Sequence, residues 1–65
     1  MILTKHAKLR YRERFGVQDD KEIIRRAQVA VVSKHNDDNT EQRRYGAIIF
    51  EICGDTIMTV KKKNI

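Results

Sequence analysis

The last third of the chain most constrains the fold, because it contains two strand-like runs joined by a glycine and an acid. Residues 44–53 and 56–62 are rich in Ile, Val, Phe and Thr, and Gly54-Asp55 separates them. A two-residue connection with glycine first is typical of a type II′ turn, which links antiparallel strands. The sequence therefore predicts a β-hairpin. The pairs expected across it are Cys53–Thr56, Glu51–Met58 and Ile49–Val60.

A helix is predicted over residues 4–15, because this segment has no glycine, proline or β-branched residue in its interior. Thr4 is a suitable N-cap, and Gly16 is expected to end the helix in the left-handed conformation. Apolar residues recur every four positions and predict one buried stripe. The expected members of this stripe are Leu3, Ala7, Tyr11 and Phe15.

A second helix is expected to begin at Asp19 or Asp20 and to end near Val32, although residues 29–32 would also suit a strand. Asp19 and Glu22 have the spacing of a capping box. The segment 33–42 is polar and rich in turn formers, so it is predicted to be a loop. The predicted buried face of the helix comprises Ile23, Ile24, Ala27, Ala30 and Val31.

These elements predict one α+β domain over residues 1–65, with two N-terminal helices packed on a C-terminal antiparallel β-hairpin or small sheet. A chain this short buries only about 60% of its unfolded surface. One cysteine cannot form an internal disulfide, and two separated histidines with one thiol do not complete a zinc site, so we expect no metal or cofactor. Both faces of the hairpin are largely apolar, which predicts a homodimer.

The charge balance predicts a polyanionic partner. Fourteen Lys and Arg residues against nine Asp and Glu give a formal net charge of +5. The excess is concentrated in the first 18 residues and in Lys61–Lys63, a pattern typical of nucleic-acid binders. Because no signal peptide or membrane-spanning segment is recognisable and the cysteine count suits a reducing compartment, we expect a cytoplasmic protein without membrane contact.

Three side chains of the first predicted helix suit phosphodiester chemistry. His6, Arg10 and Arg14 are four residues apart and therefore share one helix face. Arginines bind phosphate oxygens, and an imidazole exchanges protons near neutral pH. A solvated basic helix has the same spacing, so both interpretations stay open. The residues expected to contact nucleic acid are Lys5, Arg10, Arg12, Arg14, Arg44 and Tyr45.

Both ends of the chain resemble a known group of proteins. Residues 4–16 read TKHAKLRYRERFG, and residues 53–60 read CGDTIMTV after Tyr45-Gly46 and Phe50. This order is similar to small phage and mobile-element proteins that resemble the barnase–EndoU–colicin–RelE superfamily of ribonuclease-like toxins. The resemblance implies N-terminal helices packed on an antiparallel sheet. It also implies a catalytic set of His6, Arg10, Arg14 and Thr59. The segment 33–42 is shorter than a full four-stranded sheet of this kind requires, so an open edge and a shallow site are expected.

Three functions remain open from the sequence. The first is an RNA-binding, metal-independent endoribonuclease, in which the RNA 2′-hydroxyl attacks, His6 transfers a proton, and Arg10 and Arg14 bind the phosphate. The second is a nucleic-acid-binding regulator without catalysis. The third is a protein–protein module, inhibitor-like or antitoxin-like, that uses an apolar hairpin face. In the first two, the helix arginines are expected to matter more than the Lys61–Lys63 tail, which is expected to fray.

Overall fold

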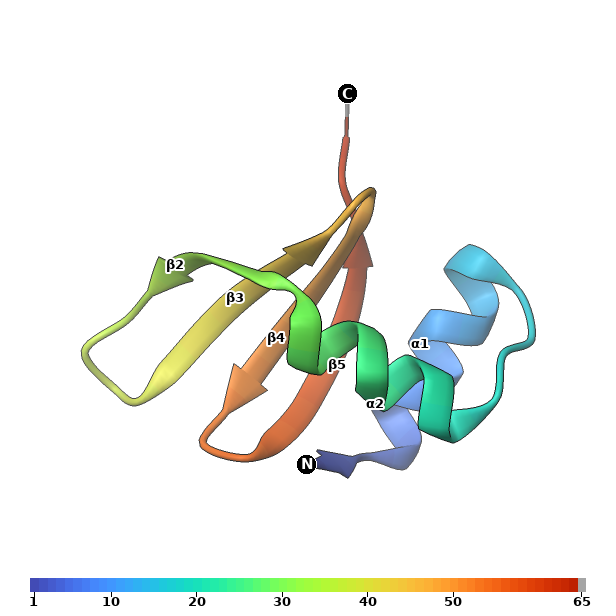
Figure 1. The fold of residues 1–65 in the computed structure, drawn as a ribbon, viewed down its shortest axis with the longest axis horizontal. Coiled ribbons are helices and arrows are strands. Elements are labelled where there is room, and N and C mark those ends of the chain that lie inside the picture. The colour runs from blue at the N-terminus through green and yellow to red at the C-terminus, as the bar shows by residue number, and fades with distance from the viewer. Residues whose placement is uncertain (65) are drawn as a thin grey trace.

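The computed structural model describes residues 1–64 as two helices and a mixed five-stranded sheet (Figure 1). Ile65, the last residue of the predicted domain, lies outside this range. The sheet order is β1-β5-β4-β3-β2, with β1 parallel to β5 and every other pair antiparallel. In chain order, the elements are β1 (Ile2–Leu3), α1 (Lys5–Phe15), α2 (Asp20–Val29), β2 (Val31–His35), β3 (Thr40–Tyr45), β4 (Ile48–Cys53) and β5 (Thr56–Lys62). The α+β class and the N-terminal position of the helices are confirmed, but the hairpin is only part of a larger sheet.

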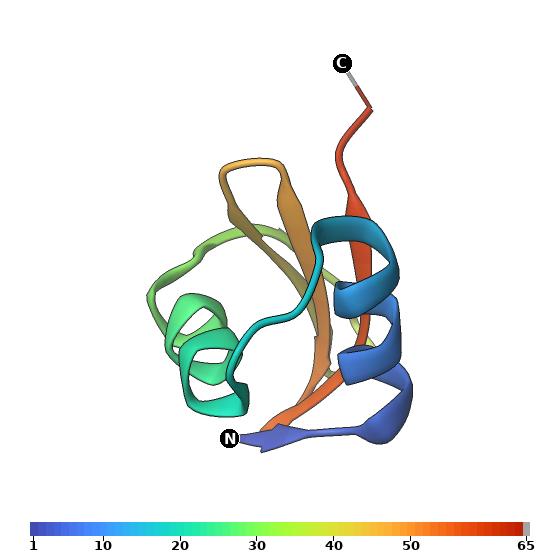
Figure 2. The same ribbon diagram turned by 90° about the vertical axis from the view of Figure 1, so that its right-hand side faces the viewer.

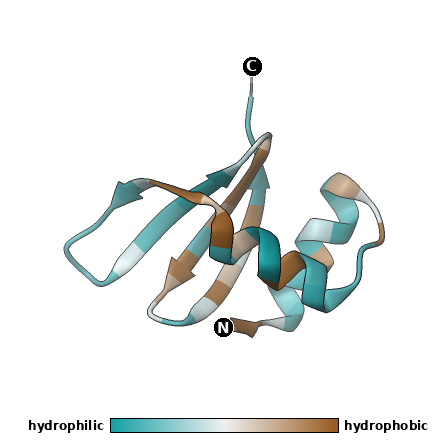
Figure 3. Cartoon of the chain, viewed as in Figure 1, coloured by the Kyte–Doolittle hydropathy of each residue, from teal (hydrophilic) through white to brown (hydrophobic). Residues whose placement is uncertain are grey.

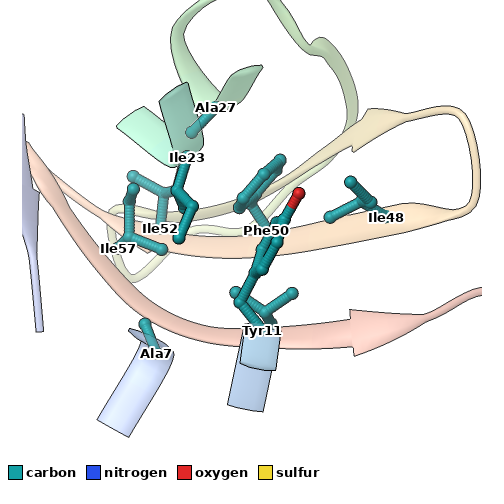
Figure 4. Packing of buried hydrophobic residues seen from close by; sticks show 9 residues of the cluster. Ala7, Tyr11, Ile23, Ala27, Ile48, Phe50, Ile52 and Ile57 are labelled. Carbon is teal, nitrogen blue, oxygen red and sulfur yellow. The ribbon is translucent and has the colours of Figure 1, made fainter. Parts of the chain in front are cut away.

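Both helices pack on one face of the sheet, α1 along β5 and α2 against β3 (Figures 1 and 2). Figure 4 shows side chains of both helices meeting those of β4 and β5. The buried core consists of Ala7, Tyr11, Ile23, Ala27, Ile48, Phe50, Ile52, Ile57 and Val60. The opposite face of the sheet, which we call the open face, carries neither helix. No helix within residues 1–64 combines the length and the apolarity needed to cross a bilayer.

The predictions for α1 are largely confirmed. The hydroxyl of Thr4 accepts a hydrogen bond from the backbone N–H of Ala7 at 3.1 Å, as an N-cap does. Gly16 has a φ of +91°, which side chains rarely adopt, although its ψ of −175° lies outside the left-handed helical region. The predicted apolar stripe faces the core, with Ala7 and Tyr11 fully buried and Leu3 and Phe15 packed at its rim.

The boundaries of α2 differ from the prediction at both ends. Asp19 is the N-cap residue, but its side chain makes no capping hydrogen bond, so the predicted capping box is wrong. Glu22 binds Arg25 and Arg26 instead. The helix ends at Val29 rather than near Val32, and the predicted core residue Val31 is 72% exposed in β2. Pairing with β3 outweighs the helical continuation of this β-branched run.

Most of the predicted loop over residues 33–42 forms strand, and this corrects both the hairpin and the short-sheet expectations. β2 and β3 leave only residues 36–39 as a turn, where Asn39 has a φ of +67°. Every residue of β2 is exposed, and β3 is hydrophilic along most of its length (Figure 3). These strands therefore lack the apolar alternation by which a sequence usually reveals a strand.

The register of the hairpin is confirmed at the turn and shifted beyond it. Cys53 pairs with Thr56 as predicted, and Gly54 has a φ of +60°. A β-bulge at Met58 then shifts the ladder by one residue, so Glu51 pairs with Thr59 and not with Met58. Ile49 likewise pairs with Lys61 rather than with Val60. As a consequence Val60, and not Thr59, enters the core.

Candidate nucleic-acid interface

His6, Arg10 and Arg14 form one ridge on successive turns of α1, which we call the α1 ridge. The side chains of His6 and Arg14 are exposed, and that of Arg10 is partly exposed. The Nε of Arg14 donates a hydrogen bond to the carbonyl oxygen of Val60 at 3.2 Å. The Nη1 of Arg10 lies 3.0 Å from the Oε2 of Glu13. The ridge therefore runs beside β5, with its last arginine fixed against the strand.

Thr4 explains why the α1 ridge follows β5. Its hydroxyl caps α1 and also donates to the carbonyl oxygen of Ile57 at 2.8 Å. The two ends of the helix are thus tied to the same strand, through Thr4 at the start and Arg14 near the end. A contact that involves both a cap and a neighbouring strand positions the whole helix, because the helix backbone is rigid between them.

Thr59 and Arg44, two further predicted site residues, lie on the open face. Thr59 precedes the buried Val60 on β5 and pairs with Glu51. Arg44 pairs with Ile49 on β4, and Ile49 pairs in turn with Lys61 on β5. Adjacent strands are about 4.8 Å apart, so Arg44 and β5 are separated by about 10 Å. The structure therefore places Thr59 on β5, the strand that α1 packs along, and leaves Arg44 two strands farther across the same sheet.

A polar row on the open face was not predicted from the sequence. Cross-strand pairing aligns Lys34, Gln42, Glu51 and Thr59 over four strands. Lys34 and Gln42 were predicted to lie in a loop, although the alternation of Thr40, Gln42 and Arg44 has the period of a strand. This row makes the open face mixed in character rather than largely apolar.

Glu51 lies at the centre of this polar row and is held by a lysine. Its Oε1 is 2.8 Å from the Nζ of Lys61 and accepts a hydrogen bond from the Nε2 of Gln42 at 3.3 Å. Glu51 is therefore held by residues of the sheet and not by the arginines of the α1 ridge. Lys61 is correspondingly part of β5 and not of a fraying tail.

The positive charge of this side of the molecule is largely free. Among the described residues, no carboxylate lies within ion-pair distance of Arg14, Arg44 or Lys34. The neighbouring carboxylates are both engaged, Glu13 by Arg10 and Glu51 by Lys61. An approaching anion therefore meets unneutralised cations, and the nearby acids do not add free negative charge.

Three predicted contact residues are not brought together with the α1 ridge. Arg12 lines a groove between α1 and α2, on the side of the helix turned away from β5. Lys5 is two helical turns from Arg12 and shares that side. Tyr45 pairs with the buried Ile48 and so faces the helices, where the Cζ of Arg26 lies 5.5 Å from its ring centroid. Its ring already binds one cation and is only partly exposed.

The arrangement suits phosphate binding better than turnover. The imidazole and the two guanidiniums lie on the outer side of a helix, where water screens charge and weakens electrostatic stabilisation of a transition state. No group of three or more His, Cys, Asp or Glu side chains in residues 1–64 is placed to hold a metal ion. Catalysis by this site would depend on His6 as the acid or base.

No family model, characterised protein or solved structure matches the chain. The resemblance to ribonuclease-like toxins therefore stays a prediction that rests on the two terminal motifs.

Proposed function

We propose that this protein binds RNA through an interface that runs from the α1 ridge, across β5, onto the open face. The observation that carries the proposal is the state of the charges on this side. Arg14, Arg44 and Lys34 have no carboxylate partner in the described chain, whereas Glu13 and Glu51 each have a cation. Phosphates that bind such cations release counterions, and this release favours association.

Arg14 is the central contact in this proposal. The hydrogen bond from its Nε to Val60 fixes the guanidinium and leaves the two terminal nitrogens to donate to phosphate oxygens. Thr59, the residue before Val60, supplies a hydroxyl that can donate to the same backbone. Arg44 and Lys34 extend the positive surface over neighbouring strands. A flexible single strand can pass from the helix to the open face of the sheet more readily than a stiff duplex.

The binding test compares two double variants with equal loss of charge. Arg10→Ala/Arg14→Ala removes the α1 ridge cations, and Lys5→Ala/Lys21→Ala removes two exposed cations elsewhere. We expect the ridge variant to bind a labelled single-stranded RNA at least about tenfold more weakly, and its log affinity to fall less steeply with log salt, by about 0.7 for each lost contact. The control variant is expected to lose less affinity at every salt concentration.

Two outcomes would contradict the proposal. Equal losses in both variants would mean that binding depends on net charge alone. No loss in either variant, measured by fluorescence anisotropy, would exclude the RNA interface and favour the protein–protein alternative.

A second candidate is metal-independent cleavage of the bound RNA, favoured by the position of His6 on the same ridge as the two arginines. The 2′-hydroxyl would attack the adjacent phosphorus and expel the 5′-oxygen, leaving a cyclic phosphate, while His6 transfers a proton. Cleavage should then need the 2′-hydroxyl and should disappear in His6→Ala, which keeps its RNA affinity. Intact RNA after incubation with the unmodified protein and a chelator would identify a binder without catalysis.

A further inference from the structure

A hollow lies between the two helices, on the side of α1 away from the α1 ridge. It has a volume of about 580 Å³ and is bounded by α1, the linker between the helices and the first turn of α2. Figure 2 shows this linker running from the end of α1 to the start of α2. We call it the interhelical groove. Its lining residues are Lys8, Tyr11, Arg12, residues 16–21 and Ile23.

The interhelical groove combines one exposed apolar side chain with a charged rim. Tyr11 and Ile23 line it but are only 2% and 1% exposed, whereas Val17 in the linker is 82% exposed. Because the side chain of Val17 remains in water in the folded chain, covering it with an apolar group of a partner would be favourable. The volume of the groove falls in the range of ligand-binding sites.

The rim of the groove has free cations. Lys8 is paired with Asp20 at 3.0 Å, but no carboxylate of residues 1–64 is within ion-pair distance of Arg12 or Lys21. Asp19 lies at the N-terminus of α2, where the helix dipole offsets part of its charge. Carboxylates that approach Arg12 and Lys21 therefore meet a favourable field.

We propose that the interhelical groove binds an acidic, amphipathic segment of a partner protein. Apolar side chains of that segment would cover Val17, while its carboxylates would pair with Arg12 and Lys21. This interaction is separate from the proposed RNA binding, since Arg12 and the α1 ridge lie on different sides of α1. The two sites allow one helix to contact two partners.

Charge spacing and stacking favour a protein over a nucleic acid in this groove. The one aromatic ring in the lining, Tyr11, is 2% exposed and offers no face on which a base could stack. Arg12 and Lys21 are two cations, whereas a nucleic-acid backbone carries a phosphate at every nucleotide, so most phosphates placed in the groove would lack a cation. A peptide can instead place single carboxylates at the two cations and apolar groups between them.

The test maps binding of a short capped peptide of alternating Leu and Glu pairs by amide chemical shifts of the labelled protein. We expect saturable shifts in residues 8–23 and at least about tenfold weaker binding of the same peptide with Gln in place of Glu, or about 1.4 kcal/mol. Val17→Asp should also weaken binding about tenfold, because its carboxylate would repel the Glu side chains of the peptide. Val17 is highly exposed, so this substitution should leave the fold intact. The control Val31→Asp, at a similarly exposed site outside the groove, should bind as the unmodified protein does.

Several results would overturn this assignment. They are equal affinity for the Glu and Gln peptides, shifts centred on the open face, and equal losses in the two aspartate variants. Displacement of the peptide by an RNA oligonucleotide from the same amides would assign the groove to nucleic acid instead. RNA binding measured on Val17→Asp tells the two proposals apart, because that variant should lose the peptide and keep the RNA.

Discussion

Glu22 organises several side chains at the surface of α2. Its carboxylate accepts hydrogen bonds from Arg25 at 2.8 and 2.6 Å and from Arg26 at 2.8 Å. Arg26 also donates to the hydroxyl of Tyr11 at 2.7 Å, which connects this network to the core. The hydrogen bonds from Arg25 and Arg26 lower the pKa of Glu22 from 4.5 to about 2. The ionised carboxylate is therefore the form that the fold stabilises.

This lowered pKa predicts a loss of stability in acid. Because the pKa of Glu22 is lower in the folded state than in the unfolded state, its ionised form stabilises the fold above about pH 4.5. That contribution should disappear as the pH falls toward 2. The free energy of unfolding, measured by urea titration, should therefore fall less steeply over this window in Glu22→Gln than in the unmodified protein.

A second carboxylate calls for a control in that experiment. Hydrogen bonds from the side chain and backbone of Thr40 lower the pKa of Asp38, which also stabilises the fold above its unfolded pKa. Asp38→Asn should remove this smaller contribution and leave that of Glu22. If Glu22→Gln and the unmodified protein lose stability in parallel, the arginine network does not stabilise the fold.

At the scale of the elements, the sheet has two edges of different construction. β1 pairs with the start of β5, and α1 binds two further carbonyls of β5 through Thr4 and Arg14. The other edge is β2, which has a bulge between Val32 and Lys34. Its lysine, Lys34, is exposed. Bulges and lysines hinder the addition of a further strand. Neither the mixed open face nor the protected β2 edge favours self-association, and the predicted homodimer stays a prediction.

The anchoring of α1 predicts the effect of changing Thr4. Thr4→Ala removes both the N-cap bond to Ala7 and the hydrogen bond to Ile57, and should lower the free energy of unfolding by about 1–2 kcal/mol. Thr4→Ser keeps the hydroxyl and should restore most of this loss. The measurement is urea unfolding followed by circular dichroism. Unchanged stability in Thr4→Ala would show that the two hydrogen bonds do not hold the helix.

At the scale of the whole molecule, the core is small and depends on few side chains. Phe50 is fully buried on the middle strand of the sheet, between residues of both helices (Figure 4). Tyr11 packs on Phe15 with ring centroids 5.4 Å apart, so one side of the core is aromatic. A domain of this size has a total stability of roughly 3–10 kcal/mol. The free-energy cost of one large cavity in the core is therefore comparable with the total stability of the domain.

Truncation of Phe50 should unfold the protein. Phe50→Ala is expected to cost about 3–5 kcal/mol, which is close to the total stability. Circular dichroism should show loss of the helices at 25 °C. Phe50→Leu, which keeps most of the volume, and Phe15→Ala, at the partly exposed rim, should both remain folded. A folded Phe50→Ala would mean that the core has other sources of stability.

The sequence by itself determined the features that depend on neighbouring residues. Thr4 and Ala7 form a cap within one turn, and Gly54-Asp55 sets the pairing of Cys53 with Thr56. The α1 ridge was predictable for the same reason, because helical spacing alone places residues four apart on one face. Such features need no knowledge of what packs against them.

Only the tertiary structure decided which segments pair over long distances. β2 is an exposed edge strand whose partner is β3, and an exposed strand has no apolar alternation to identify it. The bulge at Met58 exchanged Thr59 for Val60 in the core and gave Glu51 a lysine partner. Arg44 and Tyr45 were both predicted to contact nucleic acid, yet neighbouring strand residues point to opposite faces, so the sheet separates them. In each case the free energy comes from contacts between elements, and those contacts do not exist until the sheet has formed.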